Sequence, residues 1–290
     1  MKVKWMKFKW LFFLVSAVVI LPGVYSLIRW RLKPSIDFIG GTLLEIRADK
    51  LNKNLIERTT QEMEMELKSQ QTSGKSTYLL RFSQFKEGDK NRLVAKLEEK
   101  VGEITVTRWE TLGPALGKEL LGKTLVAIIL ATSAILLYVN SQFKDKSFGV
   151  CAILAMFHDS LVLIGSYSLL GHFFGAEADA LFVTAVLTIL SFSVHDTVVV
   201  YDRIRELRRT NPKLELKEAA NLAISQTLAR SINNSLTIIF MLLALVWLGG
   251  ATTRWFATAL LIGTVSGTYS STFTAIPLLV IWKEIFKKNK

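Results

Sequence analysis

The sequence contains one cysteine, Cys151, in a chain of 290 residues. An intrachain disulfide is therefore excluded, and since Cys151 lies within an apolar stretch, we interpret it as a small packing residue. The sequence also lacks a cluster of metal ligands, a nucleophile paired with a base and a phosphate-binding loop. We therefore expect neither a metal nor a cofactor, and an enzyme is the function class that the sequence favours least.

Charged residues are missing from long parts of the chain. Hydrophobic residues make up 50% of it and the mean hydropathy is +0.34, which is too apolar for an ordinary soluble domain of this length. Apolar stretches of about 20 residues, the length that crosses the hydrocarbon core of a bilayer, recur along the sequence. They predict a polytopic α-helical membrane protein with six spans, at residues 11–28, 124–140, 149–171, 180–200, 233–250 and 256–282.

Basic residues are scarce in every second short loop between these spans. One such loop contains only Glu177 and Asp179 as charged residues, and another contains only Arg254. Because basic residues concentrate on the cytoplasmic side, we predict a protein of the cytoplasmic (inner) membrane with cytoplasmic N- and C-termini and a cytoplasmic loop at 201–232. The basic residues on these flanks are Lys2, Lys4, Lys7, Lys9, Lys144, Lys146, Arg203, Arg205, Arg208, Arg209, Lys213, Lys217, Arg230, Lys283, Lys287, Lys288 and Lys290.

The net charge of +12 is therefore first a signal of topology. Contact with anionic lipid is a second role for it, and nucleic-acid binding is not expected. A removable signal peptide is not expected either, because the apolar run from Leu11 to Ile28 is long and no A-x-A-like cleavage site follows it. We interpret residues 1–28 as a cytoplasmic N-terminus and an uncleaved first span.

The longest polar segment, residues 29–123, separates the first two spans, and the topology places it outside the cytoplasm. Its strand and helix patterns predict one ferredoxin-like α+β domain, in which the strand near 69–75 is barely visible. Residues 124–290 then form a bundle of the second to sixth spans. The elements predicted in the polar domain are strands at 42–47, 76–83 and 103–110 and helices from Asn52 to about Leu67 and from Gly88 to Val101.

Two of the apolar spans each contain a His-Asp pair, His158-Asp159 and His195-Asp196, in the similar strings HDSLVLI and HDTVVVY. Ionisable residues within a membrane are costly, usually face a bundle interior or a water path, and mark proton or ion pathways. The pairs therefore predict proton handling. The alternative is structural, with each aspartate pairing only with a neighbouring helix and each histidine forming a hydrogen bond across helices.

Other polar residues of the spans refine this prediction. Asp196 lies about 100° around the helix from His195, so the two side chains face different neighbours. Arg230, at the start of the fifth span, either reaches a carboxylate and favours release of its proton or serves as an interface anchor. Residues on one stripe of the fourth span are Thr184, Thr188, Ser191 and His195. Small residues of the sixth span, which predict close helix packing rather than chemistry, are Gly263, Ser266, Gly267, Ser270 and Ser271.

Motifs along the whole chain resemble the SecF family, the smaller subunit of the SecDF complex that assists the bacterial Sec protein-export channel. The string that spans the end of the fourth span is especially specific. The motifs are DFIGGT at 37–42, LGPALG at 112–117, HD at 158–159, HDTVVVYDRIRE at 195–206, TLARSIN at 227–233 and SLT at 235–237.

This resemblance implies membership of the resistance-nodulation-division group, with six spans here and six more from SecD in a pseudo-symmetric unit. It implies that proton movement between the halves drives motions of the extracytoplasmic domains, which help to pull or release the emerging polypeptide. By motif position, Asp196 and Arg230 are the residues expected in the relay, and a further acid is expected on SecD. The implied partners are SecD, the Sec channel subunits and auxiliary membrane proteins, the translocating preprotein and the lipid bilayer.

One position departs from the family pattern, because family members commonly have Asn where this chain has His195. This histidine is either a neutral hydrogen-bonding substitute or a group that titrates near neutral pH. The leading hypothesis is an accessory subunit of the translocase that couples the proton motive force to export, with Asp196, Arg230, Asp159, His195 and His158 as relay candidates. The alternatives are a structural scaffold of the translocon and half of a small-molecule efflux transporter, which the small polar domain argues against.

Overall fold

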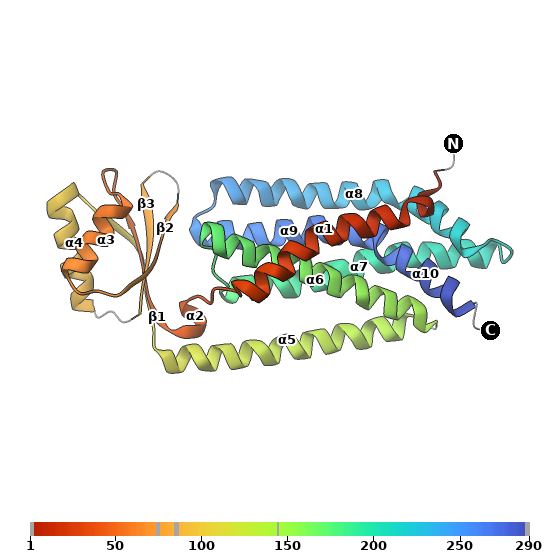
Figure 1. Cartoon of the computed structure of the whole chain (residues 1–290), viewed down its shortest axis with the longest axis horizontal. Coiled ribbons are helices and arrows are strands. Elements are labelled where there is room, and N and C mark those ends of the chain that lie inside the picture. The colour runs from red at the N-terminus through yellow and green to blue at the C-terminus, as the bar shows by residue number, and fades with distance from the viewer. Residues whose placement is uncertain (1–2, 74–75, 84–86, 144, 288–290) are drawn as a thin grey trace.

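The computed structural model describes residues 3–73, 76–83, 87–143 and 145–287. Lys2, Lys144, Lys288 and Lys290, which belong to the basic flanks predicted above, lie outside the described residues. Long helices run along the long axis of the molecule, a small α/β unit lies at one end, and both termini lie at the other end (Figure 1). The helices of the bundle are α1 (Lys9–Arg29, after the short 3-10 helix η1, Trp5–Phe8), α5 (Pro114–Gln142), α6 (Lys146–Phe174), α7 (Ala180–Thr210), α8 (Leu216–Leu248), α9 (Ala251–Phe273) and α10 (Ala275–Lys287).

Within the described residues, five helices are long and apolar enough to cross a membrane: α1 together with η1, α5, α6, α7 and α8. The sixth predicted span, 256–282, is divided between α9 and α10, which meet at Thr274. Pro277 explains the break, because it has no backbone N–H for the carbonyl of Phe273 and its ring clashes with that carbonyl. The count of six spans therefore stays a prediction.

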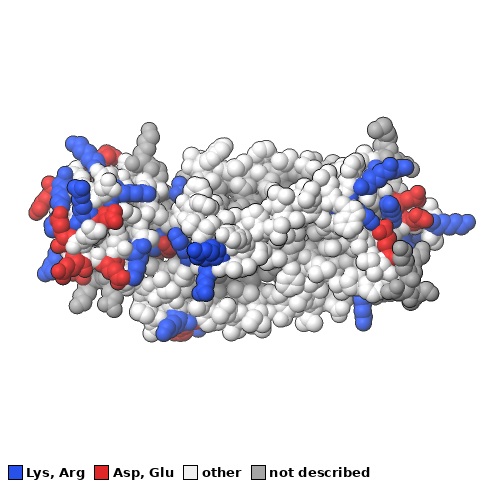
Figure 2. Space-filling model, in the orientation of Figure 1, with Lys and Arg blue, Asp and Glu red and all other residues white. Residues whose placement is uncertain are grey.

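The surface of the bundle has the character of a membrane-facing surface. Figure 2 shows Lys, Arg, Asp and Glu gathered toward the two ends of the molecule, with an almost uncharged region between them. Large apolar side chains are exposed in this region; Ile129 and Leu137 of α5, for example, are 63% and 71% exposed. Apolar surface of this extent is rare on soluble proteins, and hydrocarbon is the solvent that suits it.

The α/β unit has the element order β-α-β-β-α-β and an antiparallel sheet with strand order β2-β3-β1-β4, which is a ferredoxin-like arrangement. Its second strand is the one that is barely visible in the sequence, because its side chains form polar contacts with the bundle instead of alternating apolar ones. The elements are α2 (Ile36–Ile39), β1 (Gly41–Arg47), α3 (Lys53–Glu62), β2 (Leu67–Ser73), β3 (Thr77–Phe82), α4 (Glu87–Val101) and β4 (Thr105–Leu112).

Helix α3 begins as the sequence predicts, since the Asn52 side chain accepts a hydrogen bond from the backbone N–H of Leu55 at 2.9 Å. It ends at Glu62, earlier than the predicted Leu67, because the chain turns at Glu64 (φ 53°) into β2. One face of the sheet packs against α3 and α4 through an apolar core that includes Leu44 and Leu80.

The other face of the sheet rests on the end of the bundle through a small apolar cluster of Ile36, Leu43, Leu79 and Ala251. The α/β unit is thus seated on the bundle and is not joined to it by flexible linkers alone.

The glycines that flank the α/β unit set its position. Gly40 and Gly41 bend the chain into β1 with φ angles of 77° and 131°, which side-chain-bearing residues rarely adopt. A Cβ atom on Gly40 would lie 2.8 Å from Pro114, and one on Gly117 would lie 2.9 Å from the Gly40 nitrogen. The chain segments that enter and leave the unit therefore contact each other closely, and this contact ties the unit to the start of α5.

Candidate functional site

Asp159 lies on α6 at the centre of the bundle and is 1% exposed. Both carboxylate oxygens accept hydrogen bonds from serine hydroxyls: Oδ1 from Ser266 at 2.6 Å, and Oδ2 from Ser193 at 2.6 Å and from Ser270 at 2.5 Å. Ser193 is on α7, whereas Ser266 and Ser270 are on α9. One carboxylate thus connects three helices.

His158, the residue before Asp159, extends this network to a fourth helix. Its Nδ1 lies 3.1 Å from Asp159 Oδ1, and its Nε2 lies 2.9 Å from the hydroxyl of Ser16 on α1. The His158 side chain is only 10% exposed. The first His-Asp pair is therefore a connected, buried unit.

Asp196 on α7 has a different environment. It is 8% exposed, and its two hydrogen bonds both reach Oδ2, from Ser231 on α8 at 2.7 Å and from Ser271 on α9 at 2.5 Å. Among the described residues, no hydrogen bond reaches Asp196 Oδ1. Asp196 therefore has fewer partners than Asp159, although its sequence context is similar.

His195 does not join Asp196 in a unit like the first pair. It is exposed on the outer surface of α7, as are Thr184, Thr188 and Ser191 of the predicted stripe. Within the part of the chain that the structure describes, the His195 side chain forms no hydrogen bond or ion pair. Asp196 faces the bundle interior and His195 faces outward, which is the divergence that their helical spacing predicts.

Arg230 on α8 is exposed and forms no hydrogen bond or ion pair with Asp196 in the described region. It lines a cavity of about 780 Å³ between α7 and α8, together with Asp202, Arg203 and Glu206. Arg230 precedes Ser231, the residue that donates a hydrogen bond to Asp196. The arginine and the carboxylate are therefore near neighbours along α7 and α8 without being in contact.

The small residues of the sixth predicted span form hydrogen bonds in addition to the close packing that the sequence predicts. Ser266 and Ser270 donate hydrogen bonds to Asp159, and Ser271 donates one to Asp196. The glycines do pack closely, since a Cβ atom on Gly263 would lie 2.3 Å from the Ile189 side chain on α7. Helix α9 therefore supplies hydroxyl donors to both aspartates as well as a close helix contact.

Ser16, Ser193 and Ser231 could not be recognised in the sequence as hydrogen-bond partners of the two His-Asp pairs. Serine is common in membrane helices, and which serine faces a carboxylate depends on the packing of helices that are far apart in the chain. Among the described residues, no group of three or more His, Cys, Asp and Glu side chains has the arrangement of a metal site.

The fold and these side chains define a helical membrane protein with two buried carboxylates in its bundle and a ferredoxin-like unit at one end. The family described as "Protein export membrane protein SecD/SecF, C-terminal" matches residues 93–285. The protein translocase subunit SecF of Thermobaculum terrenum is 41% identical over 96% of this chain and 93% of its own length. The SecF subunit of Anaerolinea thermophila is also 41% identical, over 95% of this chain and 92% of its own length. The chain belongs to the SecF family of protein-export membrane proteins.

A solved structure agrees with this assignment. The crystal structure of SecDF, a translocon-associated membrane protein from Thermus thermophilus, superposes with a TM-score of 0.86 at 32% sequence identity over 98% of this chain. The match covers 39% of that SecDF chain, so the present chain corresponds to about two fifths of it.

Proposed function

We propose that this chain is an accessory subunit of the Sec protein translocase that works with SecD and couples the proton motive force to late steps of protein export across the cytoplasmic membrane. The observation that carries the proton part is the Asp196 carboxylate, which is buried yet accepts hydrogen bonds through one oxygen. A buried ionisable group in a membrane bundle is costly and usually functional. Asp196 is therefore the group proposed to take up and release protons.

The other relay candidates have different roles in this proposal. Arg230 modulates the charge of Asp196 from the cavity between α7 and α8, and His195 acts on the outward face of α7. His158 and Asp159 hold the helices together, because their polar atoms are already engaged by four serines.

SecD is the proposed partner at the outward face of α7 and α8. Two relatives, in Thermus thermophilus and Bacillus subtilis, are named SecDF and match this chain over only 34% and 37% of their lengths, so in them a SecF-like part is fused to a further polypeptide. The exposed polar stripe of α7 suits a protein partner better than lipid, because polar side chains within a bilayer face other helices or water. The Sec channel subunits and the preprotein are proposed as further partners.

The proposed topology has six spans, with α9 as the sixth, cytoplasmic termini and the α/β unit outside the cytoplasm. Support comes from the position of both termini at the end opposite the α/β unit (Figure 1). Basic residues such as Lys4, Lys7 and Lys283 lie at that end, as the positive-inside rule predicts for the cytoplasmic side.

The second candidate function is a scaffold that assembles the translocon without moving protons. The Asp159 network favours it, because three serines and a histidine around one carboxylate are what helix association in a membrane would use. The scaffold and the coupling subunit differ in what Asp196 does.

The deciding experiment measures gradient-dependent release of a secretory protein from membrane vesicles that contain wild-type or Asp196→Asn chains. Glu119→Gln is the control, since it removes an exposed carboxylate of another helix, α5, outside the cavity that Arg230 lines. The coupling proposal predicts that Asp196→Asn abolishes the gradient dependence while SecD still co-purifies. Unchanged gradient-dependent release would exclude Asp196 from the relay, and loss of SecD co-purification would support the scaffold.

A further inference from the structure

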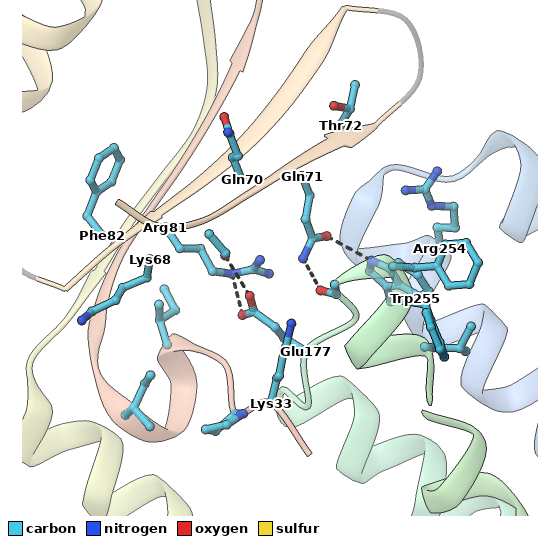
Figure 3. Close-up of a pocket in the computed structure, with 18 of the residues that line it drawn as sticks. Lys33, Lys68, Gln70, Gln71, Thr72, Arg81, Phe82, Glu177, Arg254 and Trp255 are labelled. Atoms are coloured by element: carbon cyan, nitrogen blue, oxygen red, sulfur yellow. Dashed lines mark hydrogen bonds and ion pairs between the residues drawn. The ribbon is translucent and has the colours of Figure 1, made fainter. Parts of the chain in front are cut away.

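A cavity of about 1150 Å³ lies between the α/β unit and the end of the bundle (Figure 3). Strands β2 and β3 form one side of it. The segment after α1, the loop between α6 and α7, and the start of α9 form the other side. The cavity is at the end of the long apolar helices, where the proposed topology places the lipid headgroups.

The charged side chains that line this cavity are mostly basic. They are Lys33, Lys53, Lys68, Arg81 and Arg254, with Glu177 as the carboxylate. Figure 3 shows Arg81 and Lys33 reaching toward Glu177 from the two sides of the cavity, and Arg254 beside Trp255 at another part of the wall.

The carboxylates in and near the cavity already have partners. Glu177 pairs with Arg81 Nε at 2.8 Å and accepts a hydrogen bond from Ser69 at 3.0 Å; burial raises its pKa, although Arg81 acts in the opposite direction. Asp37 and Asp179 accept hydrogen bonds from backbone N–H groups in the first turn of α7. Among the described residues, these acids therefore engage Arg81 through its Nε atom and form no ion pair with Lys33 or Arg254.

Arg81 has a hydrogen-bond donor that is not used by the protein residues described. Its Nη1 atom is buried and has no hydrogen-bond partner within the described residues, and a buried polar atom without a partner is costly. A ligand with acceptor oxygens that entered the cavity would satisfy it.

The positive-inside rule does not account for the basic residues on the bundle side of the cavity. Loops on the proposed extracytoplasmic side are poor in Lys and Arg, and Arg254 lies in the first turn of α9, directly after the connection between α8 and α9. This residue nevertheless lines the cavity, as does Lys33 after α1. Their position is better explained by binding of a negatively charged group than by a role in orienting the chain in the membrane.

The remaining wall is apolar and continues onto the surface that faces lipid. It includes Leu170, Phe173, Phe174, Val246 and Trp255. Phe173 and Phe174 at the end of α6 are 65% and 66% exposed. A cavity that combines basic groups with an exposed aromatic wall at headgroup depth suits an amphiphile with a negative head.

We propose that this cavity binds an anionic glycerophospholipid of the surrounding leaflet, with its phosphate near Lys33 and Arg81 and its acyl chains along Phe173 and Phe174. Arg254, at another part of the wall, adds positive charge to the same cavity. The bound lipid would fill the gap between the α/β unit and the bundle and so stabilise the seating of the unit. This inference is independent of proton coupling through Asp196.

The test uses native mass spectrometry of the purified, delipidated full-length chain, titrated with phosphatidylglycerol. The wild-type chain is expected to retain one phosphatidylglycerol, and Lys33→Gln/Arg254→Gln to need a concentration at least about tenfold higher. Lys118→Gln/Lys123→Gln, which removes two exposed lysines of α5 outside the cavity, is the matched control and should bind as the wild type does. Arg254→Lys should retain most of the affinity.

Three outcomes would overturn the proposal. Equal retention of phosphatidylglycerol by the cavity variant and the wild type would place any bound lipid elsewhere. Equally tight binding of glycerol 3-phosphate would identify a soluble anion as the ligand, and equally tight binding of diacylglycerol would show that the basic groups contribute nothing. Folding of each variant is checked with a maleimide dye at Cys151, which is 0% exposed and reacts after unfolding; if the double variant unfolds, the single variants replace it, each with a smaller expected loss.

Discussion

The two His-Asp pairs of the bundle have similar sequences and different surroundings. Asp159 accepts three serine hydrogen bonds, and its histidine partner adds a contact to a fourth helix. Asp196 accepts two hydrogen bonds, both through one oxygen, and His195 faces outward. Identical dipeptides on neighbouring helices thus form two different sites. We call the first a closed network, because both oxygens of Asp159 have donors, and the second an open site, because one oxygen of Asp196 has none among the described residues.

Burial alone does not single out Asp196, the carboxylate that is proposed to exchange protons. Asp159 is the more buried of the two, yet a proton that arrives there must compete with hydroxyl donors on both oxygens. Asp196 retains an oxygen without a protein donor among the described residues and lies next to an exposed polar face. A carboxylate oxygen without a protein donor, rather than depth of burial, distinguishes Asp196 from Asp159.

The largest effect is expected when each carboxylate is removed in turn. Asp159→Ala should lower the free energy of unfolding by about 2–4 kcal/mol and Asp196→Ala by about 1–2 kcal/mol, because interhelical hydrogen bonds in membranes contribute about 0.6 kcal/mol on average and up to about 1.7. Thermal unfolding in detergent, followed with a maleimide dye at the buried Cys151, measures both values. Equal losses would show that the additional hydrogen bonds of Asp159 add no stability, and the distinction between the two aspartates would be wrong.

The histidines give the next largest contrast. His158→Ala removes contacts with Asp159 and with Ser16 on α1, and we expect it to cost about 1–2 kcal/mol of stability. His195→Ala should change the stability of the isolated chain by less than about 0.5 kcal/mol, as substitutions on a surface usually do. The same thermal assay measures both, and co-purification of SecD is the second measurement for His195→Ala. A large stability loss in His195→Ala without SecD would show that this side chain has an intrachain partner.

The general architecture of this chain could be predicted from its sequence because it depends on local patterns. Apolar length predicts α1, α5, α6, α7 and α8, and alternation predicts β1, β3 and β4. The break at Thr274 depends on a single proline inside an apolar stretch, which hydropathy does not detect. Strand β2 has a polar sequence because it contacts the loop between α6 and α7 through Ser69 and Gln71, and such contacts cannot be recognised before the fold is known.

The candidate site could be predicted only in part, for a related reason. The two aspartates stand out in the sequence because a charge within an apolar span is unusual. Their serine donors do not, since Ser193 and Ser270 are 34 and 111 residues away from Asp159 along the chain. For Arg230 the sequence left two roles open, contact with a carboxylate or an interface anchor, and its position in the cavity between α7 and α8 depends on how the two helices pack.

The smallest and sharpest test uses two adjacent serines of α9. Ser270 donates to Asp159 and Ser271 donates to Asp196, each at 2.5 Å, so Ser270→Ala and Ser271→Ala make the same chemical change one residue apart. Each removes one interhelical hydrogen bond and should cost about 0.6 kcal/mol of stability. Their effects on export should differ, because only Asp196 is proposed to exchange protons.

Ser271→Ala is expected to lower gradient-dependent release from vesicles by about threefold, the rate factor that corresponds to about 0.6 kcal/mol, whereas Ser270→Ala should leave it unchanged. Release driven by ATP alone, measured in the same vesicles, is the control for channel assembly and should be equal in both variants. If Ser270→Ala lowers gradient-dependent release as much as Ser271→Ala does, Asp159 takes part in coupling as well. The distinction between a closed structural network and an open working site would then have to be abandoned, because both carboxylates would act on the same step.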